Sequence, residues 1–456
     1  MQPRPSAASI TAAPPKFVVG SLLRHILVMS GAGGVGLSAI FLSDLANVLF
    51  LSWLDDQAIL AAVGYASSIL FFTTSIGIGL GIAVTSLVSR ALGAGRRLRA
   101  RRLAVNALIA TAAVGVLVGA LIYTAIPSLL ALLGATGETH AHATRYLQIL
   151  MPSLPALTVA MTSASVLRSA GDARRAMNVT LFGAIVNTIL DPIFIFWMDL
   201  GIEGAAWATV MARLVFMGVG LYGVIRIHKL IARPRLAAFR VDVAAFAAIA
   251  LPAILTNIAT PASNAYVTAA ISTHGDAAVA GWAIIGRVLP VAFGAIYALS
   301  ASIGPIVGQN YGARQDARMR EAFRLALLVN LGLTLTAWML LALLSQNLIR
   351  LFGATGDAAH LIVLFNIWLA PLFAFMGALF VANAVFNTLG FPHYATLLNW
   401  GRATAGTVPL VYVGSWLAGA EGVLAGHMAG GILFGCIAVW LCRRLMDRLA
   451  GYGERI

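Results

Sequence analysis

Charged residues are scarce in this sequence. They make up 10% of its 456 residues, whereas hydrophobic residues make up 60%. A water-soluble domain carries roughly 25% charged residues. The composition therefore excludes a chain whose surface faces water on all sides.

Cysteines and the motifs of enzymes are also nearly missing. The only two cysteines, Cys436 and Cys442, lie close together near the C-terminus and cannot form a disulfide framework. The glycines of GIGLG (77–81) follow no predicted strand, so they are not a dinucleotide-binding fingerprint. No nucleophile–base pair or nucleotide site is visible. We therefore expect no enzyme activity, no cofactor and no use of ATP by this chain.

Long apolar runs fill most of the sequence. A helix needs about 20 residues to cross the hydrocarbon core of a bilayer. We predict an all-α integral membrane protein with twelve transmembrane helices, at 26–52, 58–83, 104–126, 144–168, 176–198, 203–228, 244–271, 278–308, 323–345, 361–389, 394–418 and 421–442.

The net charge of +14 is unevenly distributed along the chain. Basic residues cluster after the even-numbered spans, at 90–102, 168–175, 226–240, 314–324 and 443–448. Loops rich in Lys and Arg stay in the cytoplasm. The charge therefore predicts two cytoplasmic termini and no nucleic-acid partner. We expect a disordered N-terminal tail at 1–23 and a C-terminal tail at 446–456.

The chain contains an internal repeat. LLGATG (132–137) returns as LFGATG (351–356), a spacing of 219 residues that also joins Gly93 to Gly312, Pro152 to Pro371 and Gly171 to Gly390. Each half has six spans, so the two repeats are parallel and related by an axis along the membrane normal. We predict an N-lobe at 24–228, a cytoplasmic linker at 229–243 and a C-lobe at 244–445. Two such lobes suit transport by alternating access.

Two acidic residues, Asp44 and Asp191, fall well inside predicted spans. A carboxylate there costs about 2.5–3.5 kcal/mol on insertion scales and suggests a functional site. The two lie eight and seven residues before the ends of spans 1 and 5, and thus at one depth. Asn187 shares a helix face with Asp191, Asn47 shares one with Asp44, and Thr209 reaches the same level. These five residues predict a site for H⁺ or Na⁺, and no other metal.

Two further interpretations concern this region. A structural ion pair of a carboxylate with Arg213 or Arg287 is an alternative to the cation site. Pro192 follows Asp191 directly, and a proline inside a helix frees a carbonyl one turn back and bends the axis. We therefore predict a helix kink at Pro192, which either moves when Asp191 changes its charge or is a static packing feature.

A substrate cavity is harder to place without a fold. Its predicted lining residues are Phe41, Trp282, Arg287 and Asn383.

The segment VLRSAGDARRAMNVTLFGAIVNTILDPIFIF (166–196) resembles the signature of the multidrug and toxic compound extrusion (MATE) family, L-R-G-x-G-D-x-x-x-P-M followed by N-x-x-L-D. IGIGLGIAVTSLVSRALGAG (76–95) and ILAAVG (59–64) also resemble that family, and the likeness runs from about residue 24 to 442. It implies a MATE/MOP-type fold in the cytoplasmic (inner) membrane of a bacterium. It also implies a monomer that exports amphipathic compounds in exchange for H⁺ or Na⁺.

The resemblance is closest to the DinF-like branch, whose coupling Asn and Asp match Asn187 and Asp191, with Thr209 matching by spacing. The sequence departs from the family in NVLFLS (47–52), where Asn47 stands at the position of the family's first-helix Asp. Asp44, one turn earlier, is its candidate replacement. The NorM-type branch relies on acids in the C-lobe, which this chain lacks.

Other functions remain as alternatives. A lipid-linked oligosaccharide flippase of the same superfamily would use cationic residues in its cavity, such as Arg213, Arg287 and Arg402. A channel is disfavoured because no polar stripes repeat along the spans, and a membrane enzyme because no reactive cluster is visible.

Overall fold

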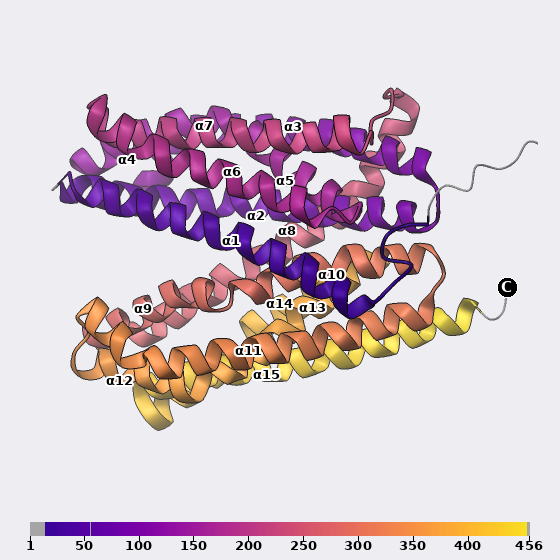
Figure 1. Cartoon of the computed structure of the whole chain (residues 1–456). Helices are drawn as coiled ribbons and strands as arrows, with labels where there is room; N and C mark the ends of the chain where they lie inside the picture. The colour runs from indigo at the N-terminus through magenta and orange to yellow at the C-terminus, as the bar shows by residue number, and fades with distance from the viewer. Residues whose placement is uncertain (1–13, 55, 454–456) are drawn as a thin grey trace, which may run out of the picture.

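The computed structural model describes residues 14–54 and 56–453, and this part of the chain is helical apart from short connections (Figure 1). The first half contains α1 (Leu22–Ser52), α2 (Gln57–Gly93), α3 (Arg97–Leu132), α4 (Gly137–Leu150), η1 (Met151–Ser153), α5 (Leu154–Ser169), α6 (Ala173–Pro192), η2 (Ile193–Trp197), α7 (Gly201–Tyr222) and η3 (Gly223–Ile227). The second half contains α8 (Leu236–Ser272), α9 (Asp276–Ala292), α10 (Gly294–Gly312), α11 (Asp316–Phe352), α12 (Gly356–Leu364), η4 (Phe365–Leu369), η5 (Ala370–Leu372), α13 (Phe373–Leu389), α14 (Pro392–Gly401), η6 (Arg402–Gly406) and α15 (Val408–Gly453).

Many of these helices are long and apolar enough to cross a membrane. Ten pass this test in the described residues, and eleven do if α9 and α10, bent by 47° at their junction, form one span. Apolar side chains such as Leu117 and Leu121 are exposed along them, as expected of surfaces that face lipid. The chain is therefore a multi-pass membrane protein, and the count of twelve spans stays a prediction.

The last helical stretch is longer than one crossing allows. It covers 59 residues, Pro392–Ala450, which as one straight helix would extend about 90 Å. Its backbone leaves the helical conformation at Ala418 and Gly419, so the stretch is divided near its middle. The prediction of a separate tail from residue 446 is wrong, because α15 continues to Gly453.

The predicted internal repeat has a counterpart in local backbone geometry. Pro152 lies in the short 3₁₀ turn η1, and its repeat partner Pro371 lies in the 3₁₀ turn η5. Gly171 and Gly390 both have positive φ, of 82° and 94°, a conformation that glycine adopts at little cost. The two halves form two helical bundles in Figure 1. The repeat therefore specifies where each lobe breaks or ends its helices.

The lobes meet closely where α2 packs on α10. A Cβ atom on Gly93 would overlap the carbonyl oxygen of Gln309, and one on Gly312 would overlap that of Arg90. Both pairs are related by the repeat spacing of 219 residues, so the contact is self-complementary about a pseudo-two-fold axis. Figure 1 shows the bundles converging at the end where α1 begins and α15 ends.

The chain before α1 reinforces this junction. Phe17 is only 1% exposed, and its backbone N–H donates to Oε1 of Gln309 at 2.9 Å. Lys16 Nζ donates to the carbonyl of Gly171 at 2.7 Å, and Arg318 Nη2 donates to that of Gly20 at 3.0 Å. The prediction of a disordered tail up to residue 23 is wrong from residue 14 onward, because this segment binds both lobes. Residues 1–13 lie outside the described part.

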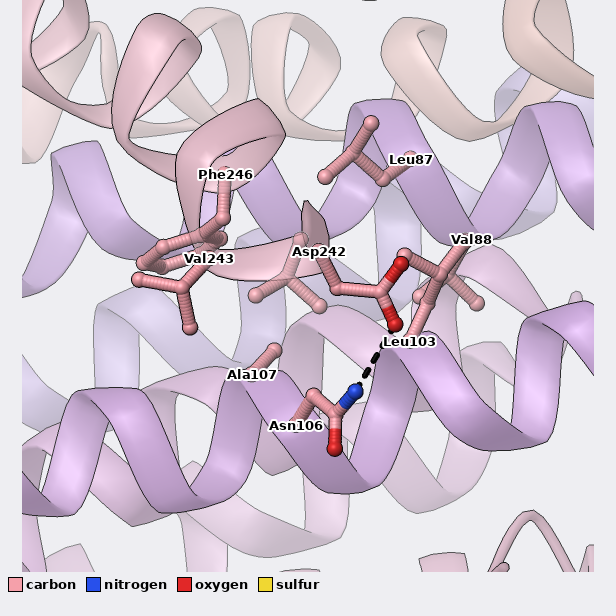
Figure 2. A pocket seen from close by; sticks show the side chains of 9 residues that line it. Leu87, Val88, Leu103, Asn106, Ala107, Asp242, Val243 and Phe246 are labelled. Carbon is pink, nitrogen blue, oxygen red and sulfur yellow. Dashed lines mark hydrogen bonds between the residues drawn. The ribbon is translucent and has the colours of Figure 1, made fainter. Parts of the chain in front are cut away.

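Helix α8 begins earlier than predicted, within the expected linker 229–243. Asp242 is buried near its start, and Arg102 of α3 binds the carboxylate through Nε at 2.9 Å and Nη2 at 3.0 Å. Asn106 Nδ2 donates to the same carboxylate at 2.7 Å (Figure 2). Residues 236–243 of the expected linker thus belong to helix α8. The ion pair of Asp242 with Arg102 holds the first turns of this helix against the N-lobe.

Asp172 closes the N-terminus of α6. Its carboxylate accepts hydrogen bonds from the backbone N–H of Arg175 at 3.1 Å and from Nε2 of His228 at 2.8 Å. Burial tends to raise the pKa of Asp172, but the hydrogen bonds from Arg175 and His228 outweigh it and hold this pKa below its ordinary value. The ionised carboxylate therefore stabilises the turn between α5 and α6.

We predict that Gly93→Ala lowers the melting temperature of the purified protein, whereas Gly64→Ala on the same helix does not. The added Cβ at Gly93 overlaps backbone of α10, and overpacking costs about 1–3 kcal/mol. At Gly64 a Cβ meets nothing within 4 Å. Thermal unfolding in detergent measures both, and equal melting temperatures for the two variants would contradict the close contact of the lobes.

We predict that Asp172→Ala lowers the melting temperature at neutral pH, since losing an N-cap costs about 0.5–2 kcal/mol. A carboxyl with a lowered folded-state pKa stabilises above its unfolded pKa and loses this contribution as the pH falls. The difference from wild type should thus shrink below about pH 4. Asp316→Ala, in the first turn of α11, is the control and should have little effect. A pH-independent difference would refute the role of the Asp172 charge.

Candidate cation site and family

Asp191 lies at the centre of a buried polar cluster between α1 and α6. Its side chain is 0% exposed. Nδ2 of Asn47 donates to Oδ1 at 3.0 Å, and Nδ2 of Asn187 donates to Oδ2 at 3.0 Å. Asn187 precedes Asp191 by one helical turn, which brings both side chains to one face of α6. Each carboxylate oxygen therefore has a neutral donor, and no ion pair to Asp191 occurs among the described residues.

Asp44, the candidate replacement for the family's first-helix Asp, does not point into the cluster around Asp191. It lies one turn before Asn47 on α1, on an exposed face, and makes no hydrogen bond or ion pair within the described chain. It is within electrostatic range of Asp191 but does not contact it. Asn47, which stands where the family has its first-helix Asp, is thus the direct partner of Asp191.

Thr209 lies near this cluster and not in it. Its hydroxyl donates to the carbonyl of Ala205 in its own helix at 3.0 Å. The buried Tyr146 of α4 is within electrostatic range of Asp191 and Asp44 and lies near Thr209. No sequence signal identified Tyr146, because its place depends on how α4 packs against α7.

The two arginines considered as ion-pair partners have other surroundings. Arg213 of α7 is buried, and its Nη1 donates to the carbonyl of Leu150 at 3.1 Å and to Oγ of Ser153 at 2.8 Å. It therefore stabilises the break between α4 and α5. Arg287 is exposed on α9. A structural ion pair of either arginine with Asp44 or Asp191 is absent from the described residues, which contradicts that alternative.

The helix changes its hydrogen-bonding pattern directly after Pro192. Helix α6 ends at this proline and continues as the π-helix η2, in which the N–H of Met198 donates to the carbonyl of Ile193 at 2.9 Å. The hydroxyl of Thr188, one turn before Pro192, donates to Oγ of Ser43 of α1 at 3.1 Å. Single π turns are frequent at functional sites. The predicted irregularity therefore takes the form of an α-to-π transition beside Asp191.

The four residues predicted to line a substrate cavity lie at separate points. Phe41 faces Gly294 at the junction of α9 and α10. Trp282 is buried and donates through Nε1 to Oγ1 of Thr268 at 2.9 Å. Asn383 is buried on α13, and its Oδ1 has no hydrogen-bond partner in the described structure. With Arg287 exposed on α9, these contacts do not join the four into one wall.

The cluster at Asp191 can bind a small cation. A buried carboxylate without a countercharge is costly, so a proton or a cation that neutralises it is held favourably. Carboxylate and amide oxygens are hard ligands, suited to Na⁺ rather than to soft metals. In the part of the chain described, no three His, Cys, Asp or Glu residues gather to hold a metal. The fold and this site together define a helical membrane transporter with a duplicated bundle.

The MatE family model matches residues 35–193 and 252–413, together more than half of the chain. The chain therefore belongs to the MATE family of transporters. One match falls in each half, in agreement with the duplication.

Similar proteins extend over nearly the whole chain. An FAD transporter of Shewanella oneidensis is 29% identical over 433 residues, covering 93% of this chain and 95% of that protein. The multidrug export protein MepA of Staphylococcus aureus is 23% identical over 433 residues, covering 91% and 92%. The crystal structure of the Vibrio cholerae MATE transporter VcmN in its bent form has a TM-score of 0.88 and 27% identity, covering 94% of this chain and 98% of that one.

We predict that Asn47→Ala and Asp191→Ala have non-additive effects on thermal stability. Residues joined by a hydrogen bond show coupling energies of about 0.5–3 kcal/mol in double-mutant cycles. Asn257→Ala serves as the control, because Asn257 donates to Ala253 within α8. Its effect should add to that of Asp191→Ala. Additivity in the Asn47 cycle, measured by thermal unfolding of the purified variants, would show that this contact does not form.

Proposed function

We propose that this protein exports amphipathic organic compounds across the bacterial cytoplasmic membrane in exchange for H⁺ or Na⁺. The observation that carries the proposal is the buried Asp191, whose carboxylate has two amide donors and no countercharge among the described residues. Membership in the MATE family and the similarity to a multidrug export protein support export as the direction of transport and organic compounds as the substrate class.

The protein works by alternating access between its two lobes, with twelve spans in total. The bend between α9 and α10 makes one span of two helices, and the break at Ala418 and Gly419 makes two spans of one long stretch. The clusters of basic residues orient the end where the lobes converge toward the cytoplasm. The contacts of Gly93 with Gln309, of Lys16 with the N-lobe and of Phe17 with the C-lobe then close the cytoplasmic side.

Asp191, Asn47 and Asn187 form the coupling site. When the carboxylate is charged, two amide donors hold it between α1 and α6. A proton or Na⁺ neutralises this charge and changes the hydrogen bonds that join the helices. The α-to-π transition after Pro192 lies next to that change, so the end of α6 is the segment that responds. Thr209 and Tyr146 border the site, and Asp44 attracts the cation from an exposed position.

One other function, that of a flippase, has less support. For a flippase, the three arginines would need to share one cavity, but Arg213 is engaged with Leu150 and Ser153 in the N-lobe. A flavin nucleotide is a second candidate substrate, because an FAD transporter is among the similar proteins. We expect the protein to act as a monomer, since each chain carries both lobes.

Transport in proteoliposomes tests the proposal. Under an imposed pH or Na⁺ gradient, Asp191→Asn should lose gradient-driven efflux, because the neutral amide binds neither cation. Substrate exchange without a gradient should persist in this variant, which separates coupling from folding. Asp44→Asn is the matched comparison and should weaken gradient-driven efflux without abolishing it, because Asp44 attracts the cation but does not bind it. Undiminished efflux by Asp191→Asn under both gradients would refute the coupling site.

A further inference from the structure

The C-lobe contains a buried arginine that the proposed coupling mechanism does not use. Arg402 is the first residue of the π-helix η6 and is only 1% exposed. Its Nη2 donates to Oγ1 of Thr260 on α8 at a long 3.4 Å, and its Nε has no partner in the described structure. The guanidinium, a group with five donors, is therefore poorly satisfied by the protein.

No carboxylate neutralises this charge. Within the described chain Arg402 forms no ion pair, and the acids of the second half lie at or near helix ends, at Asp276, Asp316, Glu321, Asp357, Glu421 and Asp447. Asp242, near the start of α8, is occupied by Arg102. Charges inside a membrane protein pair with one another or face a substrate path. Arg402 has no charged partner in the described structure, which favours a position on a substrate path.

Two other polar groups lie near the guanidinium. His427 of α15 and Tyr297 of α10 are within electrostatic range of Arg402, without a hydrogen bond to it in the described structure. His427 is 8% exposed, and its Nδ1 has no partner among the described residues. Thr260 and Tyr297 are only partly buried, so the cluster reaches the protein surface through them. It therefore combines a cation, an imidazole and two hydroxyls, which suits an anion.

One member of the cluster has a repeat counterpart near the cation site of the other lobe. After the deletion that shifts the repeat spacing to 218, as in Glu203 and Glu421, His427 corresponds to Thr209. Thr209 borders the carboxylate site through Tyr146. The N-lobe thus has an unpaired carboxylate and the C-lobe an unpaired guanidinium, although the repeat places Arg402 opposite Gly183 or Ala184, seven to eight residues before Asp191.

Aromatic rings lie beside the cluster. Tyr297 is 5.4 Å from Phe380 and 6.4 Å from Phe373 between ring centroids, and Phe373 stacks on Phe293 at 4.1 Å. The rings of Trp282 and His427 meet edge to face, with their centroids 6.0 Å apart. Flat aromatic groups bind against such rings by stacking or edge-to-face contacts.

We propose that the C-lobe binds the anionic group of the transported compound, a phosphate or a carboxylate, at Arg402, with the compound's aromatic part against Tyr297. The planar guanidinium binds such groups through two parallel hydrogen bonds, and Nε and Nη are the atoms that a bidentate contact uses. His427 and Thr260 supply further polar contacts. This inference rests on the proposed export function and names its substrate class, an aromatic anion.

Equilibrium binding of riboflavin and riboflavin 5′-phosphate tests the inference, because these fluorescent probes differ only by a phosphate. Fluorescence anisotropy with the full chain in nanodiscs of neutral lipid measures both affinities without any ion gradient. The wild type should bind the phosphorylated probe about tenfold more tightly or better, because one hydrogen bond to a charged group changes the dissociation constant by about this factor. Arg402→Gln should abolish this preference and leave riboflavin binding unchanged.

Three variants make the result specific. Arg402→Lys keeps the charge and should keep part of the preference, which guards against a folding defect in Arg402→Gln. Arg287→Gln removes an exposed arginine of the same lobe and should keep the full preference. Asp191→Asn should also keep it, so that a failure of the coupling mechanism does not affect this measurement.

Two outcomes would overturn the inference. The first is a binding measurement without the expected difference between the proteins. Either the wild type binds both flavins equally, or the Arg402→Gln variant retains the preference for the phosphorylated flavin. The second is a phosphate preference that disappears in nanodiscs of anionic lipid, together with slower release of lipid from the wild type than from Arg402→Gln. That outcome would assign the guanidinium to a lipid phosphate instead of a transported compound.

Discussion

The close approach of α2 and α10 holds the two lobes in the arrangement described here. Gly93 and Gly312 have no side chains, so each helix touches backbone of the other at Gln309 and Arg90. Residues 14–20 add hydrogen bonds across the same junction through Phe17 and Lys16. Because these contacts lie at one end of the bundles, they leave the lobes free to diverge toward the other end, as Figure 1 shows.

Each lobe contains one buried charge that the described chain does not neutralise. Asp191 in the N-lobe is held by amides, and Arg402 in the C-lobe by a single long hydrogen bond to Thr260. Both lie beside a π-helical turn, η2 or η6. A buried ion in a membrane protein is costly unless a partner compensates it. The opposite signs in the two lobes suit a protein that handles a cation and an organic compound at separate places.

Much of the fold and part of the site could be predicted from the sequence. The repeat that joins Pro152 to Pro371 reappears as paired 3₁₀ turns, because proline removes the same backbone donor in both halves. Asn187 was placed beside Asp191 by helical spacing alone. The N-terminal segment was predicted wrongly, because the partners of Phe17 are about 300 residues away in the chain, and no local pattern encodes such contacts.

The sequence by itself determined the membrane environment, the duplication and the two intramembrane acids, since these follow from composition and from periodicity along one helix. The tertiary structure decided which residues meet across helices. It selected Asn47 over Asp44 as the partner of Asp191, engaged Arg213 at the break after Leu150, and brought Tyr146 and Arg402 into polar clusters. The physical reason is that the rotation of each helix about its axis is set by packing against its neighbours, and a rotation of one residue changes which side chain faces inward.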